Sequence, residues 1–450
     1  MKVSTILLAA GKSTRMKSKT PKFLHTLLGK PMILHSLTSI NEFTTEKTMI
    51  VVGHQAQQLI DLVGDQAQYT EQKEQLGTGH AVMQCQEQLK DKSDLVVIIF
   101  GDMPLIKGET ISELIECQKA NPGPVSMLTV ISENPRGFGR IIRSSSGSVE
   151  AIIEEADCSS EQKKINELNA SMYCFNADWL WANLDKISIS PKGEYYLTDI
   201  IGIAHSQGLT IEAKIIHDPL EAMGINTRVH LAEAEKIMRR RINTGWMNAG
   251  VTMIDPDTTY IEPDVTIGTD TTIHPNTHMR GTTNIGEDCQ IGPSTVIKDS
   301  KIGNGCKVFM SVLEKAQMDD HSDIGPYGHL RKGAHLGKHV HMGNFGEVKN
   351  SYIGENSKLG HFSYIGDAEI GKNVNIGAGT ITCNYDGKNK HKTIIEDDVF
   401  IGSDTMLVAP LKIRKSSRTG AGSVVNRDVP ENTMVVGTPA RAIKKPGKNK

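Results

Sequence analysis

The stretch IGENSKLGHFSYIG, residues 353–366, places an aliphatic residue followed by glycine at every sixth position. The same step separates Ile370-Gly371 from Ile376-Gly377 and, upstream, Ile285-Gly286 from Ile291-Gly292. A period of six fits neither an α-helix nor a two-sheet sandwich. It is typical of a hexapeptide β-helix, in which each aliphatic side chain points into a prism. We therefore predict such a prism from about residue 261 to residue 437.

The composition narrows the class of protein. A chain of 450 residues is too long for one hydrophobic core, so two domains are expected. The 50 Lys and Arg residues nearly balance the 52 Asp and Glu residues, which gives no reason to expect nucleic acid or an acidic membrane as partner. Seven cysteines without a CxxC pair favour a reduced, cytoplasmic compartment. No stretch approaches the ~18 apolar residues of a membrane span.

The first half of the chain has a different pattern. Val3–Ala9, Met49–Val52 and Leu95–Phe100 are short aliphatic runs, as in strands buried within a parallel sheet. Helix-like segments, such as residues 31–39 and 79–89, lie between them. The alternation predicts a Rossmann-like, doubly wound α/β domain with its ligand at the carboxyl ends of the strands.

A change of composition marks the boundary between these halves. The segment from residue 230 to 241 is free of glycine and rich in helix formers. We predict an α/β domain at residues 1–228, a linker helix at 229–250 and the β-helix at 251–450. The three arginines 239–241 are better explained as a solvated helical face than as a phosphate-binding patch.

The loop LAAGKSTRM, residues 8–16, follows the first strand directly. Its small residues let the backbone approach a nucleotide, and its N–H groups with Arg15 can hold a triphosphate. Lys22 supplies a second cation. Asp102 comes shortly after the predicted strand Leu95–Phe100. Its carboxylate is positioned like a ligand of Mg²⁺, which prefers carboxylate and phosphate oxygens. Taken alone, each motif also fits an ordinary turn.

Residues 381–392 interrupt the six-residue rhythm with the polar stretch ITCNYDGKNKHK. A prism cannot bury such a segment, so it must leave as a loop, and loops of this kind usually carry function. His361 lies one coil earlier. For any one of the sixteen histidines a surface or packed ring is the common alternative, and His361 is singled out by its neighbours.

Several motifs occur in one order along the chain: LAAGxxTRM, Pro21-Lys22, QLGTGHA at 75–81, FGD at 100–102, GFGR at 137–140, GEYY at 193–196 and the terminal repeat. In this order they resemble the bacterial bifunctional N-acetylglucosamine-1-phosphate uridyltransferase/glucosamine-1-phosphate N-acetyltransferase family, over about residues 3–445. The resemblance implies a left-handed parallel β-helix, a cytoplasmic homotrimer formed through it, and synthesis of UDP-N-acetylglucosamine for peptidoglycan and other envelope polymers. The implied substrates are UTP, acetyl-CoA, glucosamine-1-phosphate and N-acetylglucosamine-1-phosphate.

The resemblance also implies roles for residues of the uridylyl site. Those that would hold UTP, including its uracil, are Leu8, Ala9, Ala10, Gly11, Arg15, Lys22, Gln72, Gly77 and Thr78. Those that would contact the sugar are Gly139, Glu154 and Asn169. Asp102 and Asn226 would share Mg²⁺.

In the acetyl site, the matching histidine is the general base, His361. Histidine suits this role because the glucosamine ammonium must lose a proton before it attacks a thioester. Glu347 would help to orient the ring. The implied sugar-phosphate ligands are Arg331, Lys349, Tyr364 and Asn375. The residues implied to bind or orient acetyl-CoA are Asn384, Tyr385, Ser403, Ala421 and Arg441. Asn384 and Tyr385 also match positions that help to orient the base and bind the amino sugar.

Four positions depart from the family pattern. Ser13 stands where glycine is usual, Lys332 where proline is usual, Gly346 where a larger apolar residue is usual, and Arg414 at an expected corner glycine. Ser13 could crowd the phosphates or add a hydroxyl donor. The other three could loosen a coil, because non-glycine corners strain the backbone.

Alternatives stay open for one motif and for the whole chain. His329, His335, His339 and His341 could suggest a metal site, but their spacing matches no zinc pattern, and alternate residues of a strand point opposite ways. One rival function is a pyrophosphorylase of the ADP-glucose or GDP-mannose kind, whose β-helix only assembles and regulates. Another is a catalytically inactive scaffold. His361 and the polar loop argue against the first, and the intact charged ligands argue against the second.

Overall fold

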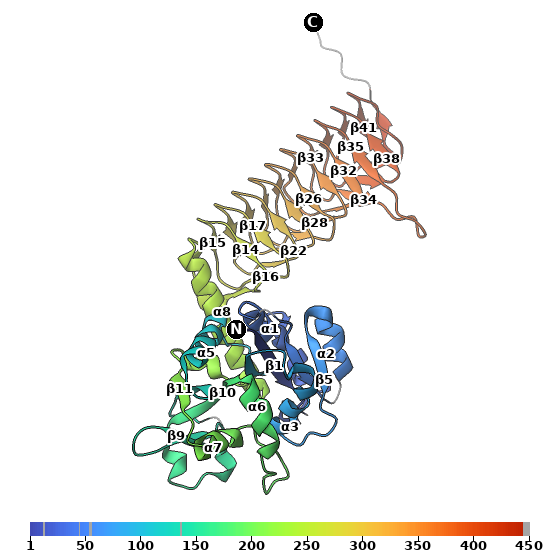
Figure 1. Cartoon of the computed structure of the whole chain (residues 1–450). Helices are drawn as coiled ribbons and strands as arrows, with labels where there is room; N and C mark the ends of the chain where they lie inside the picture. The colour runs from blue at the N-terminus through green and yellow to red at the C-terminus, as the bar shows by residue number, and fades with distance from the viewer. Residues whose placement is uncertain (12–13, 45, 54–55, 136, 444–450) are drawn as a thin grey trace. The chain divides into compact units, whose positions relative to one another are not determined.

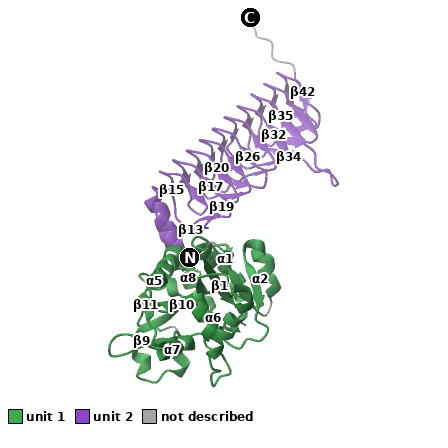
Figure 2. Cartoon of the chain, viewed as in Figure 1, with its two compact units in different colours: residues 1–238 green, residues 239–450 purple. Residues whose placement is uncertain are grey.

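The computed structural model describes residues 1–11, 14–44, 46–53, 56–135 and 137–443 (Figure 1). The chain forms two compact units, residues 1–238 and 239–450 (Figure 2). The division falls inside helix α8 (Arg228–Asn248), which covers residues 229–248 of the linker helix predicted at 229–250. Each unit has its own hydrophobic core.

Unit 1 is built on a nine-stranded sheet whose main order is β11-β7-β10-β6-β1-β4-β5. The three predicted strands form as β1 (Val3–Ala9), β4 (Met49–Val52) and β6 (Leu95–Phe100), and β1 pairs in parallel with both others. The remaining strands are β5 (Gln68–Glu71), β7 (Val125–Ile131), β8 (Arg140–Arg143), β9 (Val149–Ile153), β10 (Glu167–Asn176) and β11 (Ile211–Ile215), with a separate hairpin of β2 (Thr26–Leu27) and β3 (Lys30–Pro31).

The sheet is mixed because β10 runs antiparallel to β6 and to β7. The register of β10 against β7 shifts between Asn169 and Tyr173, and Ser171 between them has a φ of 58°. Such a bulge bends a strand and redirects its side chains. The simple alternation of strands and helices therefore predicts the parallel centre of the sheet but not this antiparallel strand.

Helices cover both faces of the sheet. Those on one face are α1 (Met32–Asn41), α2 (Ala56–Val63) and α5 (Gly108–Ala120), and those on the other are α3 (Thr78–Met83), α4 (Gln86–Leu89), α6 (Ala177–Asn183) and α7 (Asp199–Ser206). The helix predicted over residues 79–89 is thus two short helices. Among the described residues, no helix is long and apolar enough to cross a lipid bilayer.

Unit 2 is a prism of three parallel sheets, here called the first, second and third faces (Figure 1). The first face contains β12 (Thr252–Met253), β15 (Thr272–Ile273), β18 (Gln290–Ile291), β21 (Lys307–Val308), β24 (Asp323–Ile324), β27 (His341–Met342), β30 (Lys358–Leu359), β33 (Asn375–Ile376), β36 (Phe400–Ile401), β39 (Arg418–Thr419), β41 (Met434–Val436) and the antiparallel β42 (Arg441–Ala442).

The second face contains β13 (Thr259–Ile261), β16 (Thr277–Arg280), β19 (Val296–Lys298), β22 (Val312–Glu314), β25 (His329–Leu330), β28 (Gly346–Lys349), β31 (Ser363–Gly366), β34 (Ile381–Cys383), β37 (Met406–Val408) and β40 (Val424–Val425). The third contains β14 (Thr266–Ile267), β17 (Asn284–Ile285), β20 (Lys301–Ile302), β23 (Gln317–Met318), β26 (His335–Leu336), β29 (Tyr352–Ile353), β32 (Ala368–Ile370), β35 (Thr393–Ile395) and β38 (Leu411–Ile413).

The hexapeptide pattern explains this geometry. Ile353, Leu359 and Ile365 are six residues apart, and they lie on the third, first and second faces in turn. All three are buried in the prism core. Burial of one such side chain stabilises a fold by about 1.5–3 kcal/mol, so the stacked repeat supplies the core coil by coil. The predicted β-helix is confirmed.

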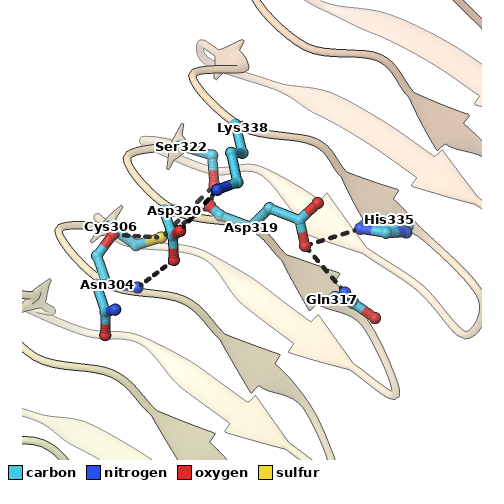
Figure 3. Close-up of polar contacts among 8 residues, drawn as sticks. All are labelled: Asn304, Cys306, Gln317, Asp319, Asp320, Ser322, His335 and Lys338. Atoms are coloured by element: carbon cyan, nitrogen blue, oxygen red, sulfur yellow. Dashed lines mark hydrogen bonds and ion pairs between the residues drawn. The ribbon is translucent and has the colours of Figure 1, made fainter.

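Polar side chains at the edges of the prism connect successive coils (Figure 3). Asp320 accepts hydrogen bonds from the backbone N–H of Asn304, at 3.0 Å, and faces Lys338 Nζ at 3.2 Å. Asp319 lies one coil before His335, with Oδ1 and Nε2 3.0 Å apart. These contacts join side chains of successive coils in pairs, and they do not converge on one point that could bind an ion.

The histidines of this region are spread around the prism. His329, His335 and His341 lie on the second, third and first faces. Each faces a carboxylate of the preceding coil, at 3.5, 3.0 and 2.7 Å respectively. Side chains on three faces cannot bind one ion. No group of three or more metal-ligating side chains occurs in the described part of the chain.

The departures from the family pattern have local explanations. Gly346 is buried, and a Cβ there would lie 2.9 Å from Met342 Cε, so a methionine side chain fills the space of a larger residue. Arg414 does not have a positive φ, whereas Ser416 does, at 56°. The strain expected at Arg414 is therefore absent, and that expectation was wrong. Lys332 is exposed beside Gly333, whose φ is 78°. Ser13 lies outside the described residues.

Candidate active sites

A cavity of about 700 Å³ opens at the carboxyl end of β1 and β6 in unit 1. It is lined by nearly all the residues that the sequence assigned to the uridylyl site: Leu8, Ala10, Gly11, Arg15, Lys22, Gln72, Gly77, Thr78, Asp102, Gly139, Glu154, Asn169 and Asn226. Ala9 instead lies buried in β1. The position agrees with the rule that ligands of doubly wound folds bind beyond the carboxyl ends of strands.

The cationic and acidic groups of this cavity form one network. Lys22 Nζ lies 2.5 Å from Asp102 Oδ2 and 2.8 Å from Asn226 Oδ1, and Arg15 donates to the same Asn226 oxygen at 3.0 Å. The carboxylate and amide oxygens therefore converge on a point held by a cationic ammonium. Oxygen ligands of this kind suit a hard divalent cation. The residues present fit a metal bound by Asp102 and Asn226.

The QLGTG loop is held by contact between two backbones. Gly79 N donates to Tyr195 O at 2.8 Å, and Tyr195 N donates to Leu76 O at 2.7 Å. Gly77 has a φ of 101°, and a Cβ on it would lie 2.6 Å from Tyr195 O. Glycine is required there, because a side chain would meet both strain and backbone. The GEYY segment thus positions the loop at the cavity.

Gln72 and Thr78 are fixed by this arrangement. The buried Gln72 donates its amide to Gly77 O at 3.0 Å and contacts His80 Nδ1 at the same distance. Thr78 Oγ1 accepts from Leu197 N at 3.0 Å. Both side chains are therefore held in place by hydrogen bonds within the protein.

The cavity is also lined by the residues assigned to the sugar. Glu154 Oε1 accepts from the Thr198 hydroxyl at 3.0 Å, and burial raises the pKa of this carboxyl above its usual value. Asn169 donates to the Tyr173 hydroxyl at 2.6 Å across the bulge of β10. The backbone N–H of Asn169 donates to Gly139 O at 2.9 Å. Three predicted sugar contacts therefore share one wall.

Sequence reasoning missed several residues that line this cavity. Tyr173 is the clearest example, because a tyrosine inside an apolar strand has the pattern of a core residue. Others include Thr14, Gln75, Ser171, Tyr196 and Thr198. Thr14, Gln75 and Tyr196 lie in the motifs LAAGKSTRM, QLGTGHA and GEYY and could have been found from them. Ser171, Tyr173 and Thr198 are brought to the cavity by the bulge and by a loop whose path the sequence pattern does not specify.

The second face of the prism carries four of the predicted acetyl-site residues, Arg331, Glu347, Lys349 and Tyr364, in or beside three successive strands. Arg331 donates to Glu347 Oε1 at 2.8 Å, and Glu347 stands opposite Tyr364 in the register of β28 and β31. The pKa of Lys349 is lowered, first by contact with the Lys390 side chain and further by the charges of Lys390 and Arg331. Three cations that repel one another on an open surface are suited to a dianionic phosphate.

His361 lies at the edge between the first and second faces, and it is exposed. The turns at this edge stack on successive coils: Gly379 N donates to Phe362 O at 2.7 Å, and Gly422 N donates to Ser403 O at 2.8 Å. Ser403 and Ala421, both predicted to contact acetyl-CoA, are exposed along the same edge as His361.

The remaining predicted residues lie elsewhere on the prism. Asn375 and Arg441 are on the first face, in β33 and β42. Asn384 begins the loop between β34 and β35 and is buried, donating to Asp367 Oδ2 at 2.6 Å. Tyr385, next to it, is exposed. One chain therefore displays the predicted acetyl-site residues on two faces, one edge and a protruding loop.

These two constellations define a class of protein: a nucleotidyltransferase unit joined to a hexapeptide-repeat acyltransferase unit. Comparison with known families supports both halves. Residues 5–159 match the MobA-like NTP transferase domain, residues 350–383 the bacterial transferase hexapeptide, and residues 392–427 the hexapeptide repeat of succinyl-transferase.

Full-length relatives support the combination. The chain is 44% identical to the bifunctional protein GlmU of Heliobacterium modesticaldum, over 97% of this chain and 95% of the relative. It is 46% identical to the GlmU proteins of Geobacillus sp. and Enterococcus faecalis, over 96% and 98% of this chain and 94% and 96% of those relatives. The chain belongs to the bifunctional GlmU family.

Family membership establishes the activity. The chain is a bifunctional enzyme of UDP-N-acetylglucosamine synthesis, with a nucleotidyltransferase activity and a hexapeptide acetyltransferase activity. Its substrates are of the nucleotide and acetyl-CoA classes. Nucleotidyltransferases of this family generally need a divalent metal.

Proposed function

We propose that unit 1 transfers a uridylyl group from UTP to N-acetylglucosamine-1-phosphate through the cavity described above. An oxygen of the sugar phosphate attacks the α-phosphorus of UTP in line, and pyrophosphate leaves. Such transfers depend on positioning and charge neutralisation more than on an acid or base. The network of Arg15, Lys22, Asp102 and Asn226 carries this proposal, because it concentrates cations and metal-ligating oxygens at one end of the cavity.

Different residues of the cavity bind the phosphates, the uracil, the sugar and the metal. Arg15 and Lys22 bind the phosphates together with the backbone of residues 8–11. Gln72, Gly77 and Thr78 bind the uracil, and Gly139, Glu154 and Asn169 bind the sugar. Asp102 and Asn226 hold Mg²⁺, which when bound neutralises charge on the phosphate oxygens. Lys22, which contacts both of these residues in this structure, would be available to bind the phosphates once they hold the metal.

Unit 2 transfers acetyl from acetyl-CoA to glucosamine-1-phosphate before the uridylyl step. His361 accepts a proton from the sugar ammonium, and the resulting amine attacks the thioester carbonyl. The tetrahedral intermediate then expels the thiolate of CoA, which takes the proton from the imidazolium. The nitrogen loses its second proton to solvent water, so that the amide is neutral and one proton is released overall. Arg331, Lys349, Tyr364 and Asn375 bind the sugar phosphate. Asn384, Tyr385, Ser403, Ala421 and Arg441 bind or orient acetyl-CoA.

The second site is completed by further copies of the chain. Asn375 and Tyr364 face different directions on one prism, so a ligand touching both needs a neighbouring first face beside the second face. Closed cyclic symmetry brings such faces together, and we propose a homotrimer through the β-helix. Because UTP and acetyl-CoA are intracellular metabolites, we place the enzyme in the cytoplasm.

A paired assay on the purified chain tests the proposal. Acetyl-CoA and glucosamine-1-phosphate are supplied with a thiol reagent, and UTP is then added with Mg²⁺ and a pyrophosphate assay. Release of CoA thiol followed by pyrophosphate is expected. Pyrophosphate from N-acetylglucosamine-1-phosphate without any acetyl transfer would support a pyrophosphorylase with a structural β-helix, and neither product would support a scaffold.

A further inference from the structure

The loop that leaves the prism between β34 and β35 forms a small hairpin, here called the 384–391 hairpin. Tyr385 pairs with Lys390 in an isolated antiparallel bridge, and His391 N donates to Asn384 O at 2.8 Å. Gly387, at the tip, has a φ of 97°. A two-stranded hairpin in water is only marginally stable, so the side chains that close it decide how well it is ordered.

Asp386 is the residue that closes this hairpin. Its Oδ1 accepts from the backbone N–H groups of Lys388 and Asn389, at 2.8 and 2.7 Å. Its Oδ2 faces His391 Nε2 on the opposite strand at 2.6 Å. The hydrogen bond from His391 and then the two backbone donors lower the pKa of Asp386 far below its usual value, so the carboxylate is ionised and the ring N–H donates. One carboxylate therefore ties the tip to the stem.

The hairpin carries the residues assigned to the acetyl site. Asn384 is anchored at its base by Asp367, and the exposed Tyr385 donates its hydroxyl to Gly387 O at 2.7 Å. Lys390, opposite Tyr385, lies beside Lys349 of the second face. An open hairpin would release both strands, and binding acetyl-CoA would then carry the added free-energy cost of ordering them, which weakens binding.

We propose that His391 is a positioning residue for acetyl transfer, acting through Asp386 to hold the hairpin in its binding conformation. The proposal rests on the acetyl-site roles of Asn384 and Tyr385 proposed above. His391 does not contact the reacting atoms in this account. Its removal changes how well acetyl-CoA is bound rather than how the proton is transferred from the sugar ammonium.

The geometry supplies a matched pair of variants. In glutamine, the amide nitrogen is as many bonds from Cβ as Nε2 is in histidine, so His391→Gln keeps a donor to Asp386. In His391→Asn the amide nitrogen corresponds to Nδ1 and does not reach. We expect His391→Ala and His391→Asn to raise the KM for acetyl-CoA about five- to tenfold with kcat changed less than twofold, and His391→Gln to restore most of the loss.

Two controls separate positioning from general damage. Uridylyl transfer by the same preparations should be unchanged. His341→Ala removes a similar histidine–aspartate contact, Nδ1 to Asp323 Oδ1 at 2.7 Å, on the first face, and it should leave the KM for acetyl-CoA unchanged. Hydrogen exchange of the Lys388 and Asn389 amides should speed up in His391→Ala and not in His391→Gln.

Three results would overturn the proposal. They are an unchanged KM in both His391→Ala and His391→Asn, a His391→Gln variant as impaired as His391→Asn, or a loss confined to kcat. If His391→Ala does not fold, the Gln and Asn variants make the same comparison. Absence of acetyl transfer in the parent chain would instead reject the acetyl-site roles proposed for the hairpin residues. The hydrogen-exchange comparison would then still test whether His391 holds the hairpin through Asp386.

Discussion

The two candidate sites differ in how much of each a single chain provides. In unit 1 the predicted residues line one cavity of about 700 Å³, formed where the strands of a sheet end. In unit 2 they lie on two outward faces, an edge and a hairpin. The carboxyl edge of a doubly wound sheet gathers loops around a ligand, whereas the predicted acetyl-site residues of the prism are spread over outward surfaces. A prism therefore needs another surface to enclose its substrate.

The largest expected effect concerns the base of the second site. His361→Ala should lower kcat for acetyl transfer by about 10³-fold, because general base catalysis commonly contributes 10²–10⁴-fold. Release of CoA thiol is the measurement. Uridylyl transfer by the same protein should be unaffected, which separates the two sites chemically. Acetylation at the parental rate would remove His361 from the mechanism.

The converse change belongs to the first site. Asp102→Ala should lower uridylyl transfer by about 100-fold, because it removes a carboxylate that orients the metal and leaves Lys22 without its ion-pair partner. Pyrophosphate release in Mg²⁺ measures this. Acetyl transfer is the internal control, and chelation by EDTA should reproduce the pattern in the parent chain. A variant that still works at the parental rate would contradict the assignment of the metal ligand.

A smaller effect is expected for the cations of the second face. Lys349→Ala should raise the KM for glucosamine-1-phosphate about tenfold, because one charge-assisted hydrogen bond to the phosphate is lost. The KM for acetyl-CoA should change little. Initial rates at varied sugar phosphate give the result. Lys332→Ala is the matched control, because Lys332 is an exposed lysine next to Arg331 without a proposed role, and its removal should leave this KM unchanged.

The smallest effect comes from Glu154, a half-buried carboxyl of the first site. Burial raises the pKa of Glu154, so the folded chain holds this proton more tightly than the unfolded chain. Its contribution to stability is therefore present below the unfolded pKa and is lost as the pH rises to the folded pKa.

Glu154→Gln removes the pH-dependent loss of stability, because glutamine does not ionise, and it keeps an acceptor for the Thr198 hydroxyl. At neutral pH we expect the melting temperature of the UTP-stabilised transition to rise by on the order of 2 °C. The gain should shrink at acidic pH, where the parent carboxyl is protonated. Thermal scans at several pH values check this. A difference that grows toward acid would contradict the assigned direction of the pKa shift.

The sequence was sufficient for the regular parts of both units. The strands Val3–Ala9, Met49–Val52 and Leu95–Phe100 appear at their predicted bounds, because aliphatic runs this short favour strands buried in a parallel sheet over helices. The hexapeptide period likewise determines the prism, since each aliphatic residue has only the interior to occupy.

What could not be predicted depends on contacts that are distant in sequence. The bulge at Ser171 and the antiparallel direction of β10 bring Tyr173 to the cavity, and nothing in the local pattern marks it. The loop after residue 381 was predicted from its polarity. Its closure by Asp386 and His391 depends on a turn geometry that polarity alone does not specify.

Subunit complementation tests the central claim, that one chain cannot form the second site alone. His361→Ala and Asn375→Ala each disable a different part of that site, on an edge and on the first face. The two variants are unfolded, mixed at equal amounts and refolded. If the base and Asn375 come from adjacent chains of a trimer, about one site in four in the mixture is intact, and acetyl transfer returns to about a quarter of the parental rate. No recovery above the separate variants would show that both residues serve the same site from the same chain.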